Sequence, residues 1–136
     1  MKGVNMKDCK EALPKNKEPA IRVLAMPKDT NPSGDIFGGW IMSQVDTAGA
    51  VAAMKRAGGR VTTVAVNSFE FKKPVLVGDL ISCYADIVKV GRTSITVQIV
   101  AYAERYEKDK CVLKVTEATI VYVALDENRK PRPIDD

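Results

Sequence analysis

The pattern of apolar and polar positions predicts one long helix in the first half of the chain. Its apolar residues recur at helical spacing and form a single stripe: Ile41, Val45, Ala48 and Ala52. A dense run of turn and capping residues at 31–35 marks the start, and two glycines at 58–59 mark the end. We therefore predict a helix over about residues 38–56.

Almost all of the remaining pattern is typical of strands. β-rich or alternating segments separated by turns predict five strands, over residues 21–26, 60–71, 80–90, 93–106 and 111–125. The fourth alternates most clearly, as a half-buried antiparallel strand does, with Ile95, Val97, Ile99 and Ala101 on one face. We expect the four longer strands to follow one another as hairpins in a sheet that curls over the helix.

The predicted fold class is α+β, a long antiparallel sheet wrapped around one central helix. A length of 136 residues suggests a single domain. We place it at residues 20–126, between a flexible N-terminal tail at 1–19 and a C-terminal tail at 127–136. Because open sheet edges pair readily with other strands, we expect dimers in which two sheets join into a larger one.

Composition narrows the class of protein. The net charge is +4, and lysines in the first seventeen residues supply much of the excess. No basic patch interleaved with aromatic residues accompanies them, so nucleic-acid binding is only a distant alternative. The chain begins polar, without the apolar region of a secretory signal. No apolar run approaches the ~20 residues of a membrane span. We expect a cytoplasmic protein.

Cysteine and histidine usage restricts the chemistry further. Cys9, Cys83 and Cys111 are odd in number and far apart, which predicts a reducing compartment and neither a disulfide framework nor a metal site. Histidine is absent, which excludes Ser-His-Asp and Cys-His catalysis and most catalytic zinc sites. Proton transfer would have to use carboxylates, lysines, tyrosines or bound water.

The predicted helix start carries a candidate site. Gly38 and Gly39 allow another group to approach the backbone closely, because glycine has no Cβ. The free N–H groups of a first helical turn attract an oxyanion or a polarised carbonyl. The alternative, on the residues alone, is that the two glycines only allow the helix to pack closely on the sheet.

A longer motif surrounds these glycines. It reads NPSGDIFGGWIMSQVD at residues 31–46, with AMP at 25–27, VAV at 64–66, KP at 73–74, VGD at 77–79 and VGR at 90–92. Together these segments resemble the hotdog-fold acyl-CoA thioesterases, and in particular the bacterial YciA-type acyl-CoA thioester hydrolases, over about residues 22–134. The resemblance implies hydrolysis of an acyl-CoA to free CoA and a carboxylic acid. It implies no cofactor beyond the substrate's own CoA, and a homo-oligomer, commonly a trimer of dimers.

The resemblance also implies the catalytic residues. In the family the active site lies between two subunits, and here its carboxylate is Asp46, facing Gly38 and Gly39 of the partner. Asp46 lies eight residues after Gly38, about 12 Å along a helix axis, so one thioester cannot reach both within one chain. Asp46 either activates a water or attacks directly, while glycine N–H groups hold the oxyanion. Asp35 either contacts substrate or caps the helix.

For coenzyme A, the resemblance points to the turn Gly91-Arg92-Thr93-Ser94, where Arg92 would pair with a phosphate. Arg60 and Lys89 are possible helpers. Two alternatives use the same fold. A hydroxyacyl dehydratase typically needs a histidine, which this chain lacks, and a non-catalytic acyl-CoA sensor usually carries an added DNA-binding domain.

Overall fold

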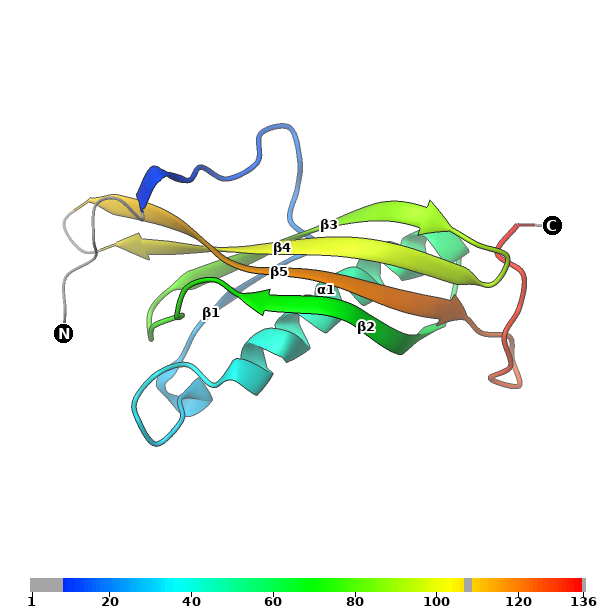
Figure 1. The fold of residues 1–136 in the computed structure, drawn as a ribbon, viewed down its shortest axis with the longest axis horizontal. Coiled ribbons are helices and arrows are strands. Elements are labelled where there is room, and N and C mark those ends of the chain that lie inside the picture. Colours follow the sequence, from blue (N-terminus) through cyan, green and yellow to red (C-terminus); the bar gives the residue numbers. More distant parts are fainter. Residues whose placement is uncertain (1–8, 107–108, 136) are drawn as a thin grey trace.

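The computed structural model describes residues 9–106 and 109–135. Over these residues it shows one long helix lying along one face of a five-stranded antiparallel sheet (Figure 1). The elements are β1 (Ile21–Leu24), the short 3-10 helix η2 (Pro27–Asp29), α1 (Gly38–Ala57), β2 (Val61–Phe71), β3 (Leu80–Val90), β4 (Ser94–Tyr106) and β5 (Lys110–Ala124). The predicted α+β class is confirmed, and the long elements begin and end within one residue of their predicted bounds.

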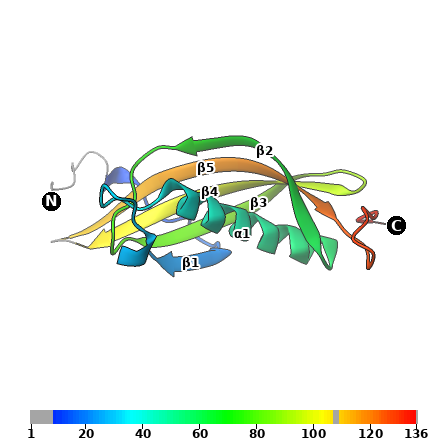
Figure 2. The ribbon, with the colours of Figure 1, turned by 90° about the horizontal axis from the view of Figure 1, so that it is seen from below.

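The strand order is β1-β3-β4-β5-β2, so the prediction of an unbroken hairpin succession is wrong. β3, β4 and β5 are successive hairpins, but β2 pairs with β5 and lies at the edge opposite β1 (Figure 2). The connection at 72–79 is long enough to allow this order. Eight residues span up to ~26 Å, whereas three strand spacings cover only ~14 Å, so the chain can cross the sheet before β3 begins.

The core lies between α1 and the inner face of the sheet. Ile95, Val97, Ile99 and Ala101 of β4 are all fully buried, as the alternating pattern predicts. The helix contributes Val45, Ala48 and Ala53 to the same cluster, and their small side chains bring its backbone close to the strands. Gly58 adopts a left-handed conformation with φ of 70° and ends the helix at the predicted place.

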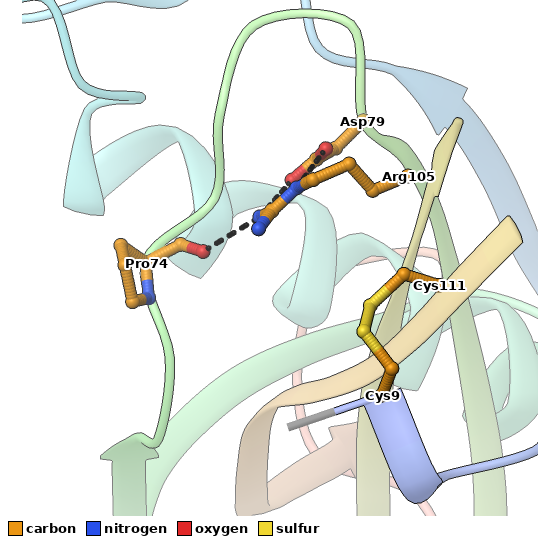
Figure 3. The surroundings of a disulfide bond; sticks show 5 residues. All are labelled: Cys9, Pro74, Asp79, Arg105 and Cys111. Carbon is orange, nitrogen blue, oxygen red and sulfur yellow. Dashed lines mark hydrogen bonds and ion pairs between the residues drawn. A yellow bond between two sulfur atoms is a disulfide. The ribbon is translucent and has the colours of Figure 1, made fainter. Parts of the chain in front are cut away.

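A buried ion pair fixes the connection between β2 and β3 (Figure 3). The Asp79 carboxylate is 1% exposed and accepts hydrogen bonds from Arg105 Nε and Nη2 at 2.9 and 2.8 Å. It also accepts one from the backbone N–H of Leu76 at 2.9 Å, and Arg105 donates to the carbonyl of Pro74. These bonds satisfy a charge that would otherwise be costly to bury, and they hold the connection against β4.

The described part of the N-terminal segment follows the sheet. Leu13 packs against a cluster of Tyr84, Tyr102 and Val112, Lys17 forms an ion pair with Asp86 at 2.7 Å, and Ala20 N–H donates to the Cys83 carbonyl at 2.8 Å. Residues 1–8 of the predicted tail lie outside the described residues. No helix in the described part of the chain is long and apolar enough to cross a membrane.

Two of the three cysteines form a disulfide, Cys9 with Cys111 (Figure 3), which corrects the expectation that none would form. Sequence spacing could not reveal it, because 102 positions separate the two residues and only the return of the N-terminal segment to β5 brings them together. Cys83 is free and buried. Burial raises the pKa of its thiol to about 12, so it stays protonated and unreactive.

Removing this crosslink should lower stability. We expect Cys9→Ser to reduce the free energy of unfolding by about 2–5 kcal/mol, because a disulfide that closes a loop of this length restricts the unfolded chain. Urea titration at fixed protein concentration, with and without dithiothreitol, measures the loss. The reductant should weaken the wild type to the level of the variant and leave the variant unchanged; a wild type indifferent to reductant would contradict the prediction.

Candidate active site

The Asp46 carboxylate lies in the middle of α1, where two neighbouring strands supply it with donors. Thr63 of β2 donates from Oγ1 to Asp46 Oδ1 at 2.7 Å, and Tyr122 of β5 donates from its hydroxyl toward the same oxygen at 3.1 Å. The Tyr122 hydroxyl also lies 2.8 Å from the backbone carbonyl of Asp46. Among the described residues, no side chain or backbone group donates to Asp46 Oδ2. The partly buried carboxylate therefore has one oxygen held and one available.

Strand register explains why Thr63 and Tyr122 meet at this point. They are direct cross-strand partners in the β2–β5 ladder, and Ile95 of β4 is the next residue in the same row. The register shifts immediately after Thr63, before Ala65. Irregularities of this kind re-aim side chains at the edge of a sheet. The row thus presents two hydroxyl groups to one position on the helix.

Gly49 allows Tyr122 to come so close to α1. A Cβ at position 49 would lie 2.9 Å from Tyr122 Cζ and 3.0 Å from Ile99 Cδ1, and it would overlap the Tyr122 hydroxyl. Tyr122 is 0% exposed. Burial and then the charge of Asp46 raise the pKa of Tyr122 well above its ordinary value. The hydroxyl therefore keeps its proton and remains a donor.

The helix N-terminus has unused donors. Phe37 is the N-cap residue, in an extended conformation and without a side-chain cap, and its carbonyl accepts from Trp40 and Ile41 N–H at 3.0 and 3.3 Å. Within the described residues, the N–H groups of Gly38 and Gly39 have no acceptor. Such groups carry the partial positive charge of the helix end, so they suit an oxyanion.

Packing within the chain does not require either glycine. A Cβ at Gly38 would meet only the Phe71 ring, at an ordinary contact distance of 3.7 Å. One at Gly39 would meet the ring of Phe37, which is 55% exposed and can move aside. The alternative that these glycines serve only close packing of the helix on the sheet therefore receives no support from this chain's own contacts.

Asp35 does not cap the helix, which corrects one of the two roles considered for it. It precedes the N-cap residue Phe37 by two positions, its side chain is exposed, and the first turn of α1 contains no acidic residue. Its backbone instead closes a turn with Asn31. The Asp35 N–H donates to the Asn31 side-chain oxygen, and the Asp35 carbonyl accepts from the Asn31 N–H. Substrate contact by Asp35 stays a prediction.

A groove of about 300 Å³ lies beside the helix start. Its walls are mostly apolar, with two lysines among them: Ile36, Gly38, Ile41, Phe71, Lys72, Lys73, Pro74 and Val75. Because the groove borders Gly38, a ligand whose carbonyl meets the free N–H groups would also contact these walls.

Most of the predicted coenzyme A residues gather at the other end of α1. Gly91 N–H donates to Ser94 O at 2.7 Å and closes the β3–β4 turn, while Thr93 O and Arg60 O accept from Ala124 and Leu125 N–H, both at 2.9 Å. Figures 1 and 2 show this turn and the C-terminal end of β5 side by side. Arg92 and Lys89 are exposed, with Arg92 in the same turn and Lys89 on β3 opposite Thr96.

A second groove, of about 630 Å³, opens at this end, and its walls come from the end of α1 and the segment after β5: Ala57, Gly58, Gly59, Arg60, Leu125, Asp126, Glu127, Asn128 and Arg132. Arg132 donates to the carbonyl of Ala57 at 2.8 Å and so caps the helix C-terminus. In the described part of the chain, no group of three or more His, Cys, Asp or Glu residues is placed to hold a metal ion.

One chain therefore holds the predicted site in separate parts. Asp46 is joined by Thr63 and Tyr122, which sequence reasoning missed, but it lies two helical turns from Gly38 and Gly39. Thr63 gave no signal within a β-rich run. Tyr122 had one indirect signal, because a glycine in a helix interior costs about 1 kcal/mol relative to alanine, and so Gly49 suggests a close neighbour.

Comparison with known proteins identifies the family. The model of the thioesterase superfamily matches residues 33–108. The acyl-CoA thioester hydrolase YciA of Salmonella typhimurium is 49% identical over 119 residues, which cover 86% of this chain and 90% of that protein. The chain belongs to the thioesterase superfamily.

Solved structures of other thioesterases share its architecture. A hexameric hotdog fold thioesterase of Campylobacter jejuni matches with a TM-score of 0.85 and 45% identity, covering 87% of this chain and 90% of that one. An acyl-CoA hydrolase of Staphylococcus aureus, in complex with butyryl coenzyme A, coenzyme A and coenzyme A disulfide, matches with a TM-score of 0.76 and 30% identity, covering 83% and 68%. The hotdog fold expected from the sequence is confirmed.

The Gly49–Tyr122 contact leads to a stability prediction. Gly49→Ala should gain up to about 1 kcal/mol of helix propensity but cost about 1–3 kcal/mol of overpacking. We expect overpacking to prevail, with a net loss of up to about 2 kcal/mol, because Tyr122 is fully buried on β5, between β4 and β2. Urea unfolding at fixed protein concentration tests this. Unchanged or increased stability would show that the Tyr122 ring can shift without cost.

Proposed function

We propose that this protein is an acyl-CoA thioester hydrolase that releases free CoA and a carboxylic acid. The observation that carries the proposal is the Asp46 carboxylate, which has one oxygen held by Thr63 and Tyr122 and the other without a donor among the described residues. In a hydrolase without histidine, a carboxylate of this kind can serve as the base. The 49% identity to a named acyl-CoA thioester hydrolase supports the same conclusion.

The Staphylococcus aureus hydrolase supports the choice of Asp46 and Thr63. Its structures include an aspartate-to-alanine and a threonine-to-alanine mutant. The two mutated positions are 17 residues apart in that protein, and the hydrogen-bonded Asp46 and Thr63 are also 17 apart here. We assign Asp46 as the general base that activates a water, with Thr63 orienting it. An acyl group trapped on Asp46 in rapid-quench mass spectrometry would contradict the water route.

The reacting carbonyl belongs at the helix N-terminus of a partner subunit. Gly38 and Gly39 N–H groups would polarise the thioester carbonyl and hold the oxyanion, with Asp35 close by. Since these groups and Asp46 lie about 12 Å apart along one helix, two antiparallel helices related by a two-fold axis would form the site twice per dimer. The apolar groove at Gly38 would then receive the acyl chain.

The exposed edge of the sheet supports such a dimer. β2 is an edge strand, and Val64, Val66 and Phe71 along it are each about half exposed. An unpaired apolar edge of this kind is a surface for strand pairing. We propose that two β2 strands join the sheets of a dimer. Because the Campylobacter jejuni relative is hexameric, we also propose three such dimers per assembly.

The nucleotide of coenzyme A is proposed to bind at the β3–β4 turn. Arg92 would pair with a phosphate, with Gly91, Thr93 and Ser94 as donors and Arg60 and Lys89 as further cations. No cofactor is required. We place the protein in the cytoplasm. Thiol reductants there would keep Cys9 and Cys111 as reduced thiols.

Replacing the base tests the function directly. Asp46→Asn keeps the size of the side chain but removes the base, so we expect kcat/KM to fall by about 10²–10⁴-fold. Free-thiol release from short- to long-chain acyl-CoAs measures it, and the panel also gives the preferred chain length. Asp86→Asn, an exposed carboxylate paired with Lys17, is the matched control and should keep wild-type rates.

Two results would overturn this assignment in different ways. A wild type that binds CoA without hydrolysing any acyl-CoA would indicate a sensor in place of an enzyme. An active Asp46→Asn variant beside an inactive Asp35→Asn variant would keep the reaction and move the base to Asp35.

A further inference from the structure

The Tyr122 hydroxyl lies where two oxygens of one residue compete for it. It is 2.8 Å from the Asp46 backbone carbonyl and 3.1 Å from Asp46 Oδ1. A tyrosine hydroxyl has one proton and donates to one acceptor at a time. Thr63 also donates a single proton, at 2.7 Å, to the same Oδ1. Whichever bond Tyr122 makes, it constrains Asp46, either through its backbone or through its carboxylate.

The two donors differ in rigidity. Within one chain, Thr63 is exposed on the edge strand β2, so the core does not fix its hydroxyl. Tyr122 is 0% exposed on β5, with Gly49 and Ile99 against its ring. No other side chain bonded to Asp46 among the described residues is fixed by the core in this way. Tyr122 is therefore the rigid reference for the carboxylate.

We propose that Tyr122 is a positioning residue for the proposed thioesterase reaction. By holding Asp46 either at its backbone carbonyl or at Oδ1, it keeps Oδ2 aimed at the water that attacks the thioester. The proposal rests on Asp46 being the base. Without the Tyr122 hydroxyl, and with the exposed Thr63 as its one donor among the described residues, the carboxylate would spend part of its time in unproductive orientations, and misplacement on the scale of 1 Å costs about 10²-fold in rate.

Gly49 contributes to the same positioning of Asp46 by Tyr122. Helix α1 forgoes the helix propensity of alanine at this position, and a Cβ there would displace the Tyr122 ring. If only packing mattered, alanine at position 49 and a smaller residue at position 122 of β5 would fill the same space. The combination of Gly49 with a full-sized tyrosine places a hydroxyl, and not merely an apolar contact, against the backbone of Asp46.

The test is Tyr122→Phe, which removes the hydroxyl and keeps the ring. We expect kcat for acyl-CoA hydrolysis to fall about 10- to 100-fold while KM stays within about twofold, because Tyr122 is 0% exposed and offers no surface to a substrate. A merely structural role would leave kcat unchanged in the folded enzyme. Wild-type kcat in folded Tyr122→Phe overturns the proposal.

Tyr102→Phe is the matched control. Tyr102 is also buried, at 8% exposure, but it packs with Tyr84 and Val112 in a cluster separate from the core around α1. Loss of its hydroxyl should leave both kcat and KM at wild-type values. An equal fall in kcat for Tyr102→Phe would show a general effect of replacing a tyrosine in the sheet and would overturn a specific role for Tyr122.

A double-mutant cycle links the effect to Asp46. If Tyr122 acts through the carboxylate, Tyr122→Phe should lower kcat in the wild type and have no further effect in Asp46→Asn. The same fold-change in both backgrounds overturns the proposal.

If Tyr122→Phe does not fold, Gly49→Ala tests the role of Tyr122 in its place. This variant should lower kcat at unchanged KM, and a wild-type kcat overturns the role of Tyr122. Failure of the wild type to hydrolyse any acyl-CoA would instead refute the proposed function itself.

Discussion

The close approach of α1 to β5 is the constraint on which the candidate site depends. Small residues on the helix, with Gly49 at the point of contact, bring its backbone near the sheet, and the Tyr122 ring fills the space that a side chain at position 49 would need. The hydroxyl therefore meets the carbonyl and carboxylate of Asp46. The candidate base is fixed from the core of the domain, which positions side chains more rigidly than a loop does.

The edge strand β2 connects this site to assembly. Among the strands of the described residues, it pairs with β5 alone, yet it supplies Thr63, the second donor to Asp46. Its outer edge is unpaired and apolar within one chain. Pairing of that edge with a second copy would restrict β2 and, with it, the Thr63 hydroxyl. Assembly and orientation of the carboxylate are in this way expected to be coupled.

Sequence patterns predicted the elements better than their connections. The α1 stripe and the alternation in β4 are local signals that each depend on one buried face. The four β4 positions are buried, and so are Ile41, Val45 and Ala48 of the stripe, whereas Ala52 is only partly buried and Ala53 takes the core position. The partner of β2 depends on a long connection that local patterns do not constrain. The Cys9–Cys111 bond and the Thr63–Tyr122 pair depend on contacts between distant segments. The spacing of residues in the sequence does not predict such contacts. The family motif pointed to Asp46, but only the register of β2 and β5 shows what holds it.

The length of the helix is the physical argument for the proposed site shared between two chains. At ~1.5 Å per residue, the 20 residues of α1 span about 30 Å, with free N–H groups at one end and the predicted nucleotide turn near the other. Asp46 lies between them, too far from Gly38 for one thioester carbonyl to meet both. Shortening the helix would remove the core that holds Tyr122 in place. In the proposed dimer, a second, antiparallel helix would bring an oxyanion site to Asp46 without that loss, so the rigid core and a complete site would be compatible.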